Sequence, residues 1–145
     1  MKINLKNGID KLIFGMKQND VIAIYGKPTK NYNDEDDNVI FVYNNLKIRM
    51  TFYKDEELRL GYLVASSPNL ELFGIKIIAK KITEIKKDLA QKGIVKFTQE
   101  EFDTFENYFN EENWIIFQTE FDEVVKFEIG AIINNKDEFE WKFKK

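Results

Sequence analysis

The sequence of 145 residues contains no cysteine and no histidine. The lack of cysteine excludes disulfide bonds, thiolate metal sites and cysteine nucleophiles, and the lack of histidine removes the commonest metal ligand and general base. Proline occurs only twice, and no tract rich in serine, glycine or proline indicates a linker. We therefore expect a single domain, 1–145, with no metal, no cofactor and no catalytic site.

Long hydrophobic runs are also missing. No segment approaches the roughly 18 continuous apolar residues of a membrane-spanning helix, and the start, MKINLKNGID, lacks the apolar run of a signal peptide. The net charge is −3, and there is no basic stripe of the kind that duplex nucleic acids require. We expect a cytoplasmic protein that binds neither membrane nor nucleic acid and whose partner is a protein with a basic surface.

The sequence does contain a weak internal repeat. A shift of 67 residues aligns Gly26 with Gly93 and the pair Asp55-Glu56 with the pair Asp122-Glu123. The apolar residues that the same shift aligns are Ile48 with Ile115, Met50 with Phe117, and Leu58, Leu60 and Tyr62 with Val125, Phe127 and Ile129. Such self-similarity predicts a fold built from two related units.

Both copies predict a helix before the shared glycine. In the first, KQNDVIAIYGKP has apolar residues at helical spacing, then a glycine where a left-handed cap is needed and a proline just beyond. Phe14-Gly15 meets Phe73-Gly74 at a shift of 59, so the second copy gains eight residues ahead of its later glycine, close to two helical turns. We therefore expect the longest helix near 78–92, with Ile82, Ile85 and Leu89 buried.

After each predicted helix the apolar period falls to two, which is typical of strands. LKIRMTF and LRLGYLV predict a hairpin around KDEE, a strand in NVIFVYNN precedes it, and NWIIFQTEFDEVVKFEIGA repeats the hairpin. Residues 98–109 are ambiguous because their phenylalanines also suit a helix, but the repeat favours a strand near 105–109. Alternating aromatic and charged residues in EFEWKFKK predict a C-terminal strand near 138–144.

These elements predict an α+β fold. Each of two tandem repeats, about 8–65 and 68–132, is expected to be a helix followed by three antiparallel strands. Because each strand has only one clearly apolar side, we expect the two units to form one continuous sheet with the helices on one face.

The motif FGMKQNDVIAIYGKP resembles a pattern that opens the helix and three-strand modules of β-lactamase inhibitory proteins and of small outer-membrane assembly lipoproteins. Tandem modules of similar shape also occur among small bacterial toxin-immunity proteins. The inhibitory proteins are secreted and disulfide-bonded and the lipoproteins carry an N-terminal cysteine, whereas this chain has no cysteine. The resemblance therefore implies a cytosolic binding module built as a two-unit sheet.

Acidic residues form the densest charged segments. The four consecutive carboxylates are Asp34, Glu35, Asp36 and Asp37. They indicate either an acidic loop that docks on a basic partner and speeds association, or an ordinary solvated loop. A calcium loop is disfavoured, since the glycine and glutamate at its required positions are missing. The residues at the equivalent place in the second repeat are Glu100, Glu101 and Asp103; they indicate a matching acidic edge or the start of a short helix capped by Thr98.

The uncovered face of the predicted sheet is the other candidate binding surface. There Arg49, Tyr53 and Arg59 have the composition of an interaction hot spot, which favours arginine and aromatic anchors. The same residues also fit a solvated face with cross-strand ion pairs. Trp114 and Trp141 are predicted to pack in the core or at its rim.

Together these features predict a non-catalytic protein-binding inhibitor, namely a cytosolic immunity protein that neutralises a cognate bacterial toxin by occlusion. The alternative is a structural or assembly adaptor that holds a protein partner through the same sheet. No spacing of carboxylates singles out a catalytic pair, and no glycine-rich phosphate loop is present.

Overall fold

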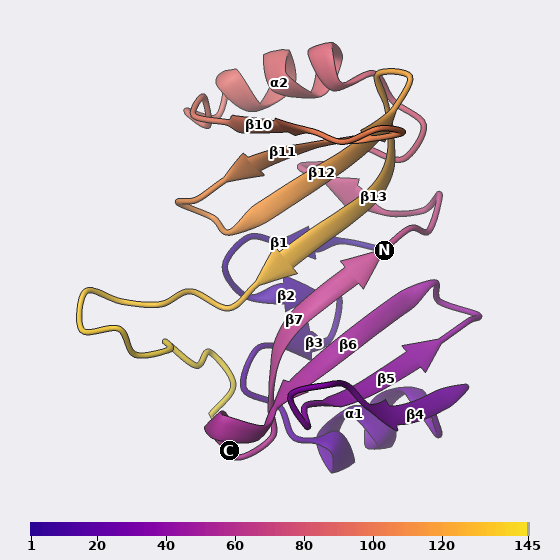
Figure 1. Cartoon of the computed structure of the whole chain (residues 1–145), viewed down its shortest axis with the longest axis vertical. Coiled ribbons are helices and arrows are strands. Elements are labelled where there is room, and N and C mark those ends of the chain that lie inside the picture. The colour runs from indigo at the N-terminus through magenta and orange to yellow at the C-terminus, as the bar shows by residue number, and fades with distance from the viewer. Residues whose placement is uncertain (145) are drawn as a thin grey trace.

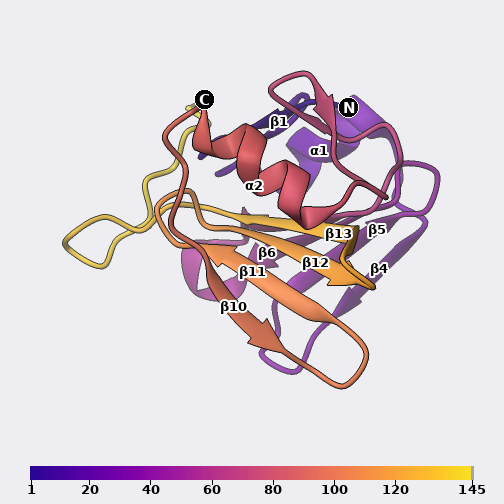
Figure 2. The same ribbon diagram turned by 90° about the horizontal axis from the view of Figure 1, so that it is seen from above.

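The computed structural model describes residues 1–144 and is mostly β, with 41% of residues in strands and 14% in helices. Eight antiparallel strands form one sheet, and two helices and two small sheets lie against one of its faces (Figures 1 and 2). The other face, called the open face below, carries no helix formed by the described residues. No helix within the described residues is long and apolar enough to cross a membrane.

The main sheet consists of two four-stranded halves. The strands of the first half are β4 (Lys30–Asn33), β5 (Val39–Tyr43), β6 (Ile48–Tyr53) and β7 (Arg59–Ala65). The strands of the second half are β10 (Thr98–Glu101), β11 (Glu106–Asn110), β12 (Ile115–Glu120) and β13 (Glu123–Gly130). The order across the sheet is β10-β11-β12-β13-β7-β6-β5-β4, so the last strands of the two halves meet at its centre. There Leu63 of β7 pairs with Ile129 of β13.

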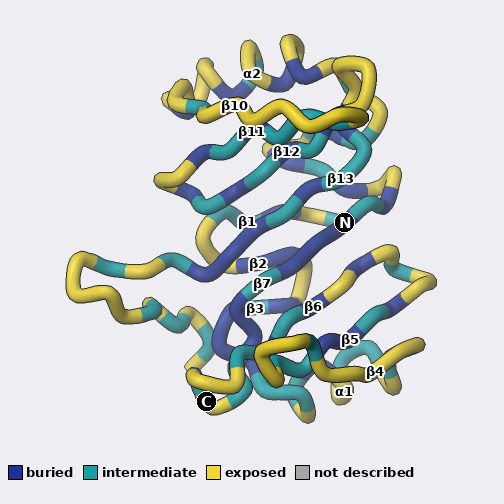
Figure 3. Tube along the Cα trace, in the orientation of Figure 1, coloured by how far each residue is buried: buried dark blue, intermediate teal, exposed yellow. Residues whose placement is uncertain are grey.

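Short elements make up the covering layer. They are β1 (Ile3–Asn4), β2 (Gly8–Ile9), β3 (Leu12–Ile13), α1 (Gln18–Tyr25), β8 (Glu71–Leu72), β9 (Ile75–Lys76) and α2 (Ile82–Ala90); a 3-10 turn, η1 (Lys54–Glu56), joins β6 to β7. Helix α1 lies with the first half and α2 with the second (Figure 1). The core between this layer and the sheet includes the fully buried Phe14, Phe52, Phe117 and Phe127. Buried residues are concentrated along β7 and β13, and exposed residues along the two edges (Figure 3).

The predicted alternation is confirmed for β6 and β12, but not for β7, where a bulge puts Leu60, Leu63 and Ala65 on the buried face in place of the predicted Leu58, Leu60, Tyr62 and Val64. In β6, Ile48, Met50 and Phe52 are buried, whereas Arg49 is exposed and Thr51 is half-buried. β12 has the same pattern. Side chains of a strand point alternately to its two faces, so each inner strand buries one row against the covering layer.

The predicted α+β class, with two units of one helix and three strands, is wrong. Each half has a fourth strand, β4 or β10, and these two strands are the outer edges of the sheet. Every residue of both is exposed, so their sequences, KNYN and TQEE, have no apolar alternation from which a strand could be predicted. Backbone pairing with β5 and with β11 holds them in the sheet.

The two halves correspond at the shift of 67 residues only as far as their third strands. β5 and β6 match β11 and β12 at this shift, and a bulge follows Thr51 in one half and Gln118 in the other. The connection before β7, 54–58, has five residues and the turn before β13, 121–122, has two, a difference of three. The shift therefore falls to 64, and it is Leu63, not Leu60, that corresponds to Phe127.

The longer helix has the predicted buried stripe but not the predicted length. Ile82, Ile85 and Leu89 are buried in α2, which has nine residues against eight in α1. Most of the additional residues of the second copy lie before the helix. Residues 75–81 connect Gly74 to α2, whereas only residues 16–17 connect Gly15 to α1. The prediction of two additional helical turns is therefore wrong.

The two Phe-Gly pairs are not equivalent in the structure. Phe14 is completely buried after β3, whereas Phe73 is 44% exposed in the β8–β9 turn. Phe73 has φ 52° and Gly74 has φ 79°, as a two-residue hairpin turn requires. The Phe-Gly dipeptide therefore contributes a core phenylalanine in the first copy and forms an exposed tight turn in the second.

The predicted strand near 105–109 is confirmed as β11. The expected C-terminal strand near 138–144 is replaced by a loop segment, 131–144, that turns back on itself and lies outside the main sheet (Figure 1). The backbone N–H groups of Lys142 and Phe143 donate to the carbonyl of Phe14 at 3.1 and 2.9 Å. The rings of Phe139 and Trp141 stack at 4.8 Å, so the predicted aromatic row does pack on the core, although not as a sheet strand.

Candidate protein-binding site

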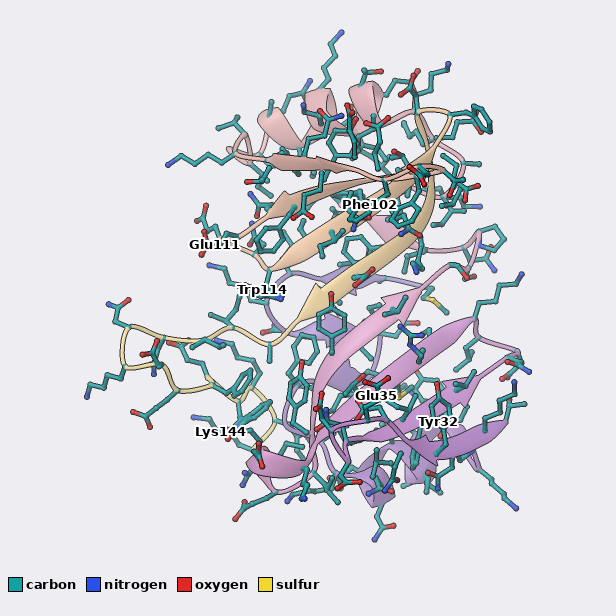
Figure 4. All side chains as sticks on the ribbon, in the orientation of Figure 1. Tyr32, Glu35, Phe102, Glu111, Trp114 and Lys144 are labelled. Carbon is teal, nitrogen blue, oxygen red and sulfur yellow. The ribbon has the colours of Figure 1, made fainter. Side chains whose placement is uncertain are left out.

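The sequence-predicted site residues lie at three separate locations. The first acidic run lies in the β4–β5 turn, the residues predicted on the sheet face lie on β6 and β7, and the second acidic group lies on β10 and in the β10–β11 turn. β4 and β10 are opposite edges, and seven steps of about 4.8 Å place them roughly 34 Å apart. Glu35 and Phe102 mark the two halves (Figure 4). The two acidic groups therefore do not form one rim.

Two of the four carboxylates in the β4–β5 turn have structural roles. Asp34 Oδ1 accepts hydrogen bonds from the backbone N–H groups of Asp36 and Asn38 at 2.9 and 3.0 Å, and its Oδ2 accepts one from Asn38 Nδ2 at 3.1 Å. Desolvation acts to raise the pKa of Asp34, but these hydrogen bonds outweigh it and hold the pKa below its ordinary value. Asp37 forms an ion pair with Lys54 at 3.5 Å. Glu35, Asp36 and Asp37 are all exposed to solvent, and of these Asp37 is engaged by Lys54.

The C-terminal segment engages two of the three residues predicted on the sheet face. The ring of Tyr53 packs against that of Phe139, with centroids 5.6 Å apart. Arg59 lies 6.0 Å from the ring of Trp141 and forms an ion pair with Glu57 at 2.7 Å. Of the predicted face residues, only Arg49 is exposed on the open face.

The second acidic group surrounds three phenylalanines, Phe102, Phe105 and Phe121, which we call the aromatic tip. Phe102 and Phe105 stack in the β10–β11 turn with ring centroids 4.6 Å apart. Phe121, in the neighbouring β12–β13 turn, is 97% exposed, and Phe102 is 46% exposed. The two turns line one hollow of about 430 Å³. The carboxylates that line it are Asp103, Glu106 and Glu120, and no lysine or arginine among the described residues does.

The β12–β13 turn holds Phe121 in an unfavourable backbone conformation. Phe121 and Asp122 are its two central residues and have φ of 50° and 66°. This two-residue turn needs positive φ at both positions, which favours Asn-Gly, whereas a side chain such as phenylalanine there costs roughly 1–2 kcal/mol. The backbone N–H of Ile82 donates to the carbonyl of Asp122 at 2.9 Å and ties the turn to the start of α2. This hydrogen bond helps to hold in place the backbone that exposes Phe121.

The charge at the tip also acts on the half of the sheet beneath it. Tyr108 of β11 is buried, and its hydroxyl donates to the carboxylate of Glu106 at 3.1 Å. Burial first, then Glu106, and more weakly the charges of Asp122 and Glu101, raise the pKa of Tyr108 to about 12. Burial is thus the main cause of the shift, and the carboxylates at this end of the sheet add to it.

The tip has no arrangement suited to metal chemistry. Among residues 1–144, no group of three or more aspartates or glutamates is placed to hold a metal ion. Within the same range, every buried side-chain nitrogen and oxygen atom has a hydrogen-bond partner. Exposed aromatic rings beside carboxylates can bury apolar surface against another protein and attract its cations.

Sequence reasoning placed Glu100, Glu101 and Asp103 at the tip but missed Phe121. The single shift of 67 residues put the turn at Asp122-Glu123, which made Phe121 look like the end of a strand. The signal that was available is a phenylalanine between acidic residues, in EFDE, at a predicted hairpin turn. That Phe121 lies in the turn, and that its ring is exposed, follows only from the two-residue length of the β12–β13 turn in the structure.

Comparisons with known proteins give one structural similarity and no sequence family. No family model and no curated protein matches the chain. The solved structures include a similar one, the crystal structure of an extracellular protein containing a SCP domain from Bacillus anthracis str. Ames. The TM-score is 0.53 and the sequence identity is 12%, over 80% of this chain and 43% of that chain. At this identity the likeness is one of fold alone, and this chain spans less than half of that protein's length.

These findings correct part of the sequence-based expectation. The mostly β fold contradicts the α+β repeat of helix and three-strand units that carried the resemblance to inhibitory and immunity proteins. The comparisons also give no support to an immunity protein or toxin inhibitor. The expectation of a protein partner does not depend on that family.

Proposed function

We propose that this chain is a protein-binding module that acts without catalysis, and that its aromatic tip docks on a basic surface of its partner. The observation that carries the proposal is Phe121, which is 97% exposed at a backbone position that disfavours it. Exposing a large aromatic ring and straining the turn that holds it both work against stability, so binding is the benefit that accounts for them.

The shape of the tip suits a binding hot spot. Phe102 and Phe105 are held together by ring stacking and by a hydrogen bond from the backbone N–H of Phe102 to the carbonyl of Phe105 at 2.9 Å. Phe121 lines the same hollow as this pair. Rigid aromatic side chains lose little conformational entropy when they are buried, which is why a few of them can supply most of the affinity of an interface.

The charge of the tip defines the partner. Asp103, Glu106 and Glu120 line the hollow without a compensating cation, so a surface rich in lysine and arginine is complementary to it. Complementary charge steers the encounter and accelerates association, and salt screens this effect. A basic protein with an apolar pocket for Phe121 is the partner that this chemistry fits.

Photo-crosslinking from the tip tests the proposal. A photo-reactive phenylalanine analogue at position 121 should crosslink a basic protein in cells, whereas the same analogue at Tyr32, an exposed residue on β4, should not. With the captured partner purified, Phe121→Asn should weaken binding about 30-fold or more, as loss of a hot-spot side chain does.

Phe73→Asn is the matched control. Phe73 is also an exposed phenylalanine at positive φ in a two-residue turn, but it lies in the β8–β9 hairpin and does not line the hollow. It should leave affinity unchanged. Equal affinity of the wild type and Phe121→Asn for the captured protein would refute docking through the tip.

The partner's own activity separates two forms of this function. An inhibitor abolishes an activity of the bound protein, whereas an adaptor leaves that activity intact and links the protein to a further component. Assaying the captured protein with and without this chain distinguishes the two.

A further inference from the structure

A second hollow lies on the open face, where the two halves of the sheet meet. Its volume is about 370 Å³, and β5, β6, β7, β13 and the β5–β6 turn contribute to it. The lining residues that bear on its chemistry are Val42, Lys47, Arg49, Val64, Ser66 and Lys126. The charge of this hollow is opposite to that of the aromatic tip, so the two sites are expected to bind ligands of opposite charge.

Sheet register brings the three cationic residues together from separate segments. Arg49 of β6 pairs with Val42 on one side and with Val64 on the other. Lys47 lies in the turn before β6, and its carbonyl accepts a hydrogen bond at 3.0 Å from the backbone N–H of Ser66 just after β7. Lys126 comes from β13, whose Phe127 pairs with Ala65. On this face Arg49 thus lies between two valines, and Lys47 and Lys126 line the same hollow from neighbouring segments.

The cationic residues of this hollow form no ion pair with the described residues. The four ion pairs found among residues 1–144 involve Lys54, Arg59, Lys80 and Lys142, and none involves Lys47, Arg49 or Lys126. No carboxylate lines the hollow. The nearest one in the sheet register is Glu128, which pairs with Val64 and accepts a hydrogen bond from the hydroxyl of Tyr62. A chain of net charge −3 therefore has a local cationic site on its uncovered face.

We propose that this hollow binds an extended acidic segment of a protein partner. Successive side chains of an extended peptide point to opposite sides, so every second residue faces the sheet, and a segment with acidic residues at alternate positions can place carboxylates on Arg49 and Lys126. Guanidinium and ammonium groups form the strongest hydrogen bonds with carboxylates, and Arg49 can engage one through two parallel bonds. The aromatic tip, lined by Asp103, Glu106 and Glu120, repels such a segment.

Anisotropy of a fluorescein-labelled peptide of alternating glutamate and valine tests the proposal on the full chain. The peptide should bind, and Arg49→Gln and Lys126→Gln should each weaken binding about tenfold or more and reduce its dependence on salt. Lys136→Gln is the matched control, because Lys136 is an exposed lysine in the 131–144 segment, and it should change nothing. Urea unfolding of each variant separates lost binding from lost folding.

Two further ligands decide what the hollow recognises. Binding of a peptide of alternating lysine and valine should not depend on Arg49 or Lys126, and inorganic phosphate should compete only weakly because one anion cannot engage both cations as a peptide with several carboxylates does. Binding of the glutamate peptide that is insensitive to Arg49→Gln and Lys126→Gln would overturn the proposal. Phosphate binding that depends on Arg49, with no binding of the peptide, would also overturn it and would assign the hollow to a small anion. Phe121→Asn should leave peptide binding unchanged, so this test stands apart from that of the aromatic tip.

Discussion

Glu120, the last residue of β12, lies directly opposite Glu123, the first residue of β13, across the turn that carries Phe121. Like charges in a directly opposed pair destabilise a hairpin, and the two residues between them both have positive φ without being glycine. The end of this hairpin therefore combines two locally destabilising features, the pair of like charges and the positive φ angles of two non-glycine residues. Such departures are expected where a surface serves a function.

Replacing Phe121 by Asn should stabilise the fold. Asparagine tolerates positive φ better than phenylalanine, so the free energy of unfolding should rise by about 1 kcal/mol. Urea denaturation measures it. Phe73→Asn should produce a similar gain, since Phe73 has φ 52° in its own turn. If Phe121→Asn lowers stability instead, the ring supports the fold and is not held for a partner.

Leu89→Ala should destabilise the protein strongly. Leu89 is 3% exposed on the buried stripe of α2, and truncation of a buried leucine removes apolar contacts and leaves a cavity, at a cost of about 2–5 kcal/mol. Val95→Ala is the control, because Val95 is 64% exposed and should change stability by no more than about 0.5 kcal/mol. Thermal or urea unfolding compares the two; similar losses would mean that the stripe of α2 is not packed.

Gly61→Ala should destabilise the sheet through Tyr53. A Cβ atom on Gly61 would lie 2.1 Å from Cε2 of the Tyr53 ring, which is itself packed against Phe139. Overpacking of this kind costs about 1–3 kcal/mol. In a Tyr53→Ala background the ring is absent, so the same Gly61→Ala change should cost much less. Additive effects in this double-mutant cycle would argue against the contact.

Alkaline pH should weaken the fold partly through Tyr108. Its folded-state pKa is raised to about 12, above the ordinary value of 10.0, so the neutral hydroxyl is favoured by folding. This contribution is complete below pH about 10 and is lost as pH rises through about 12. Tyr108→Phe should therefore lose less stability than the wild type over this window in urea unfolding, while Tyr32→Phe, at a 45% exposed position, should follow the wild type. Equal alkaline losses in Tyr108→Phe and wild type would exclude this role.

Much of the core could be predicted from sequence because burial leaves a periodic pattern. The alternation Ile48, Met50, Phe52 identified an inner strand, and the spacing of Ile82, Ile85 and Leu89 identified the buried side of α2. Each depends on the contrast between apolar and polar neighbours along one short segment. The lack of cysteine and histidine likewise excluded whole classes of site before any fold was known.

The edges and the turns were decided only by the tertiary structure. β4 and β10 are entirely exposed, so backbone hydrogen bonds to a neighbouring strand, and not their side chains, make them strands. The connections before β7 and β13 differ in length by three residues, and this difference sets which residues of β7 and β13 correspond. An alignment of apolar residues at a single shift cannot reveal such a change. The two-residue length of the β12–β13 turn also decided that Phe121 faces solvent. In the sequence, a phenylalanine at the end of a strand cannot be told from one in a turn, because the two differ only in what packs against the ring.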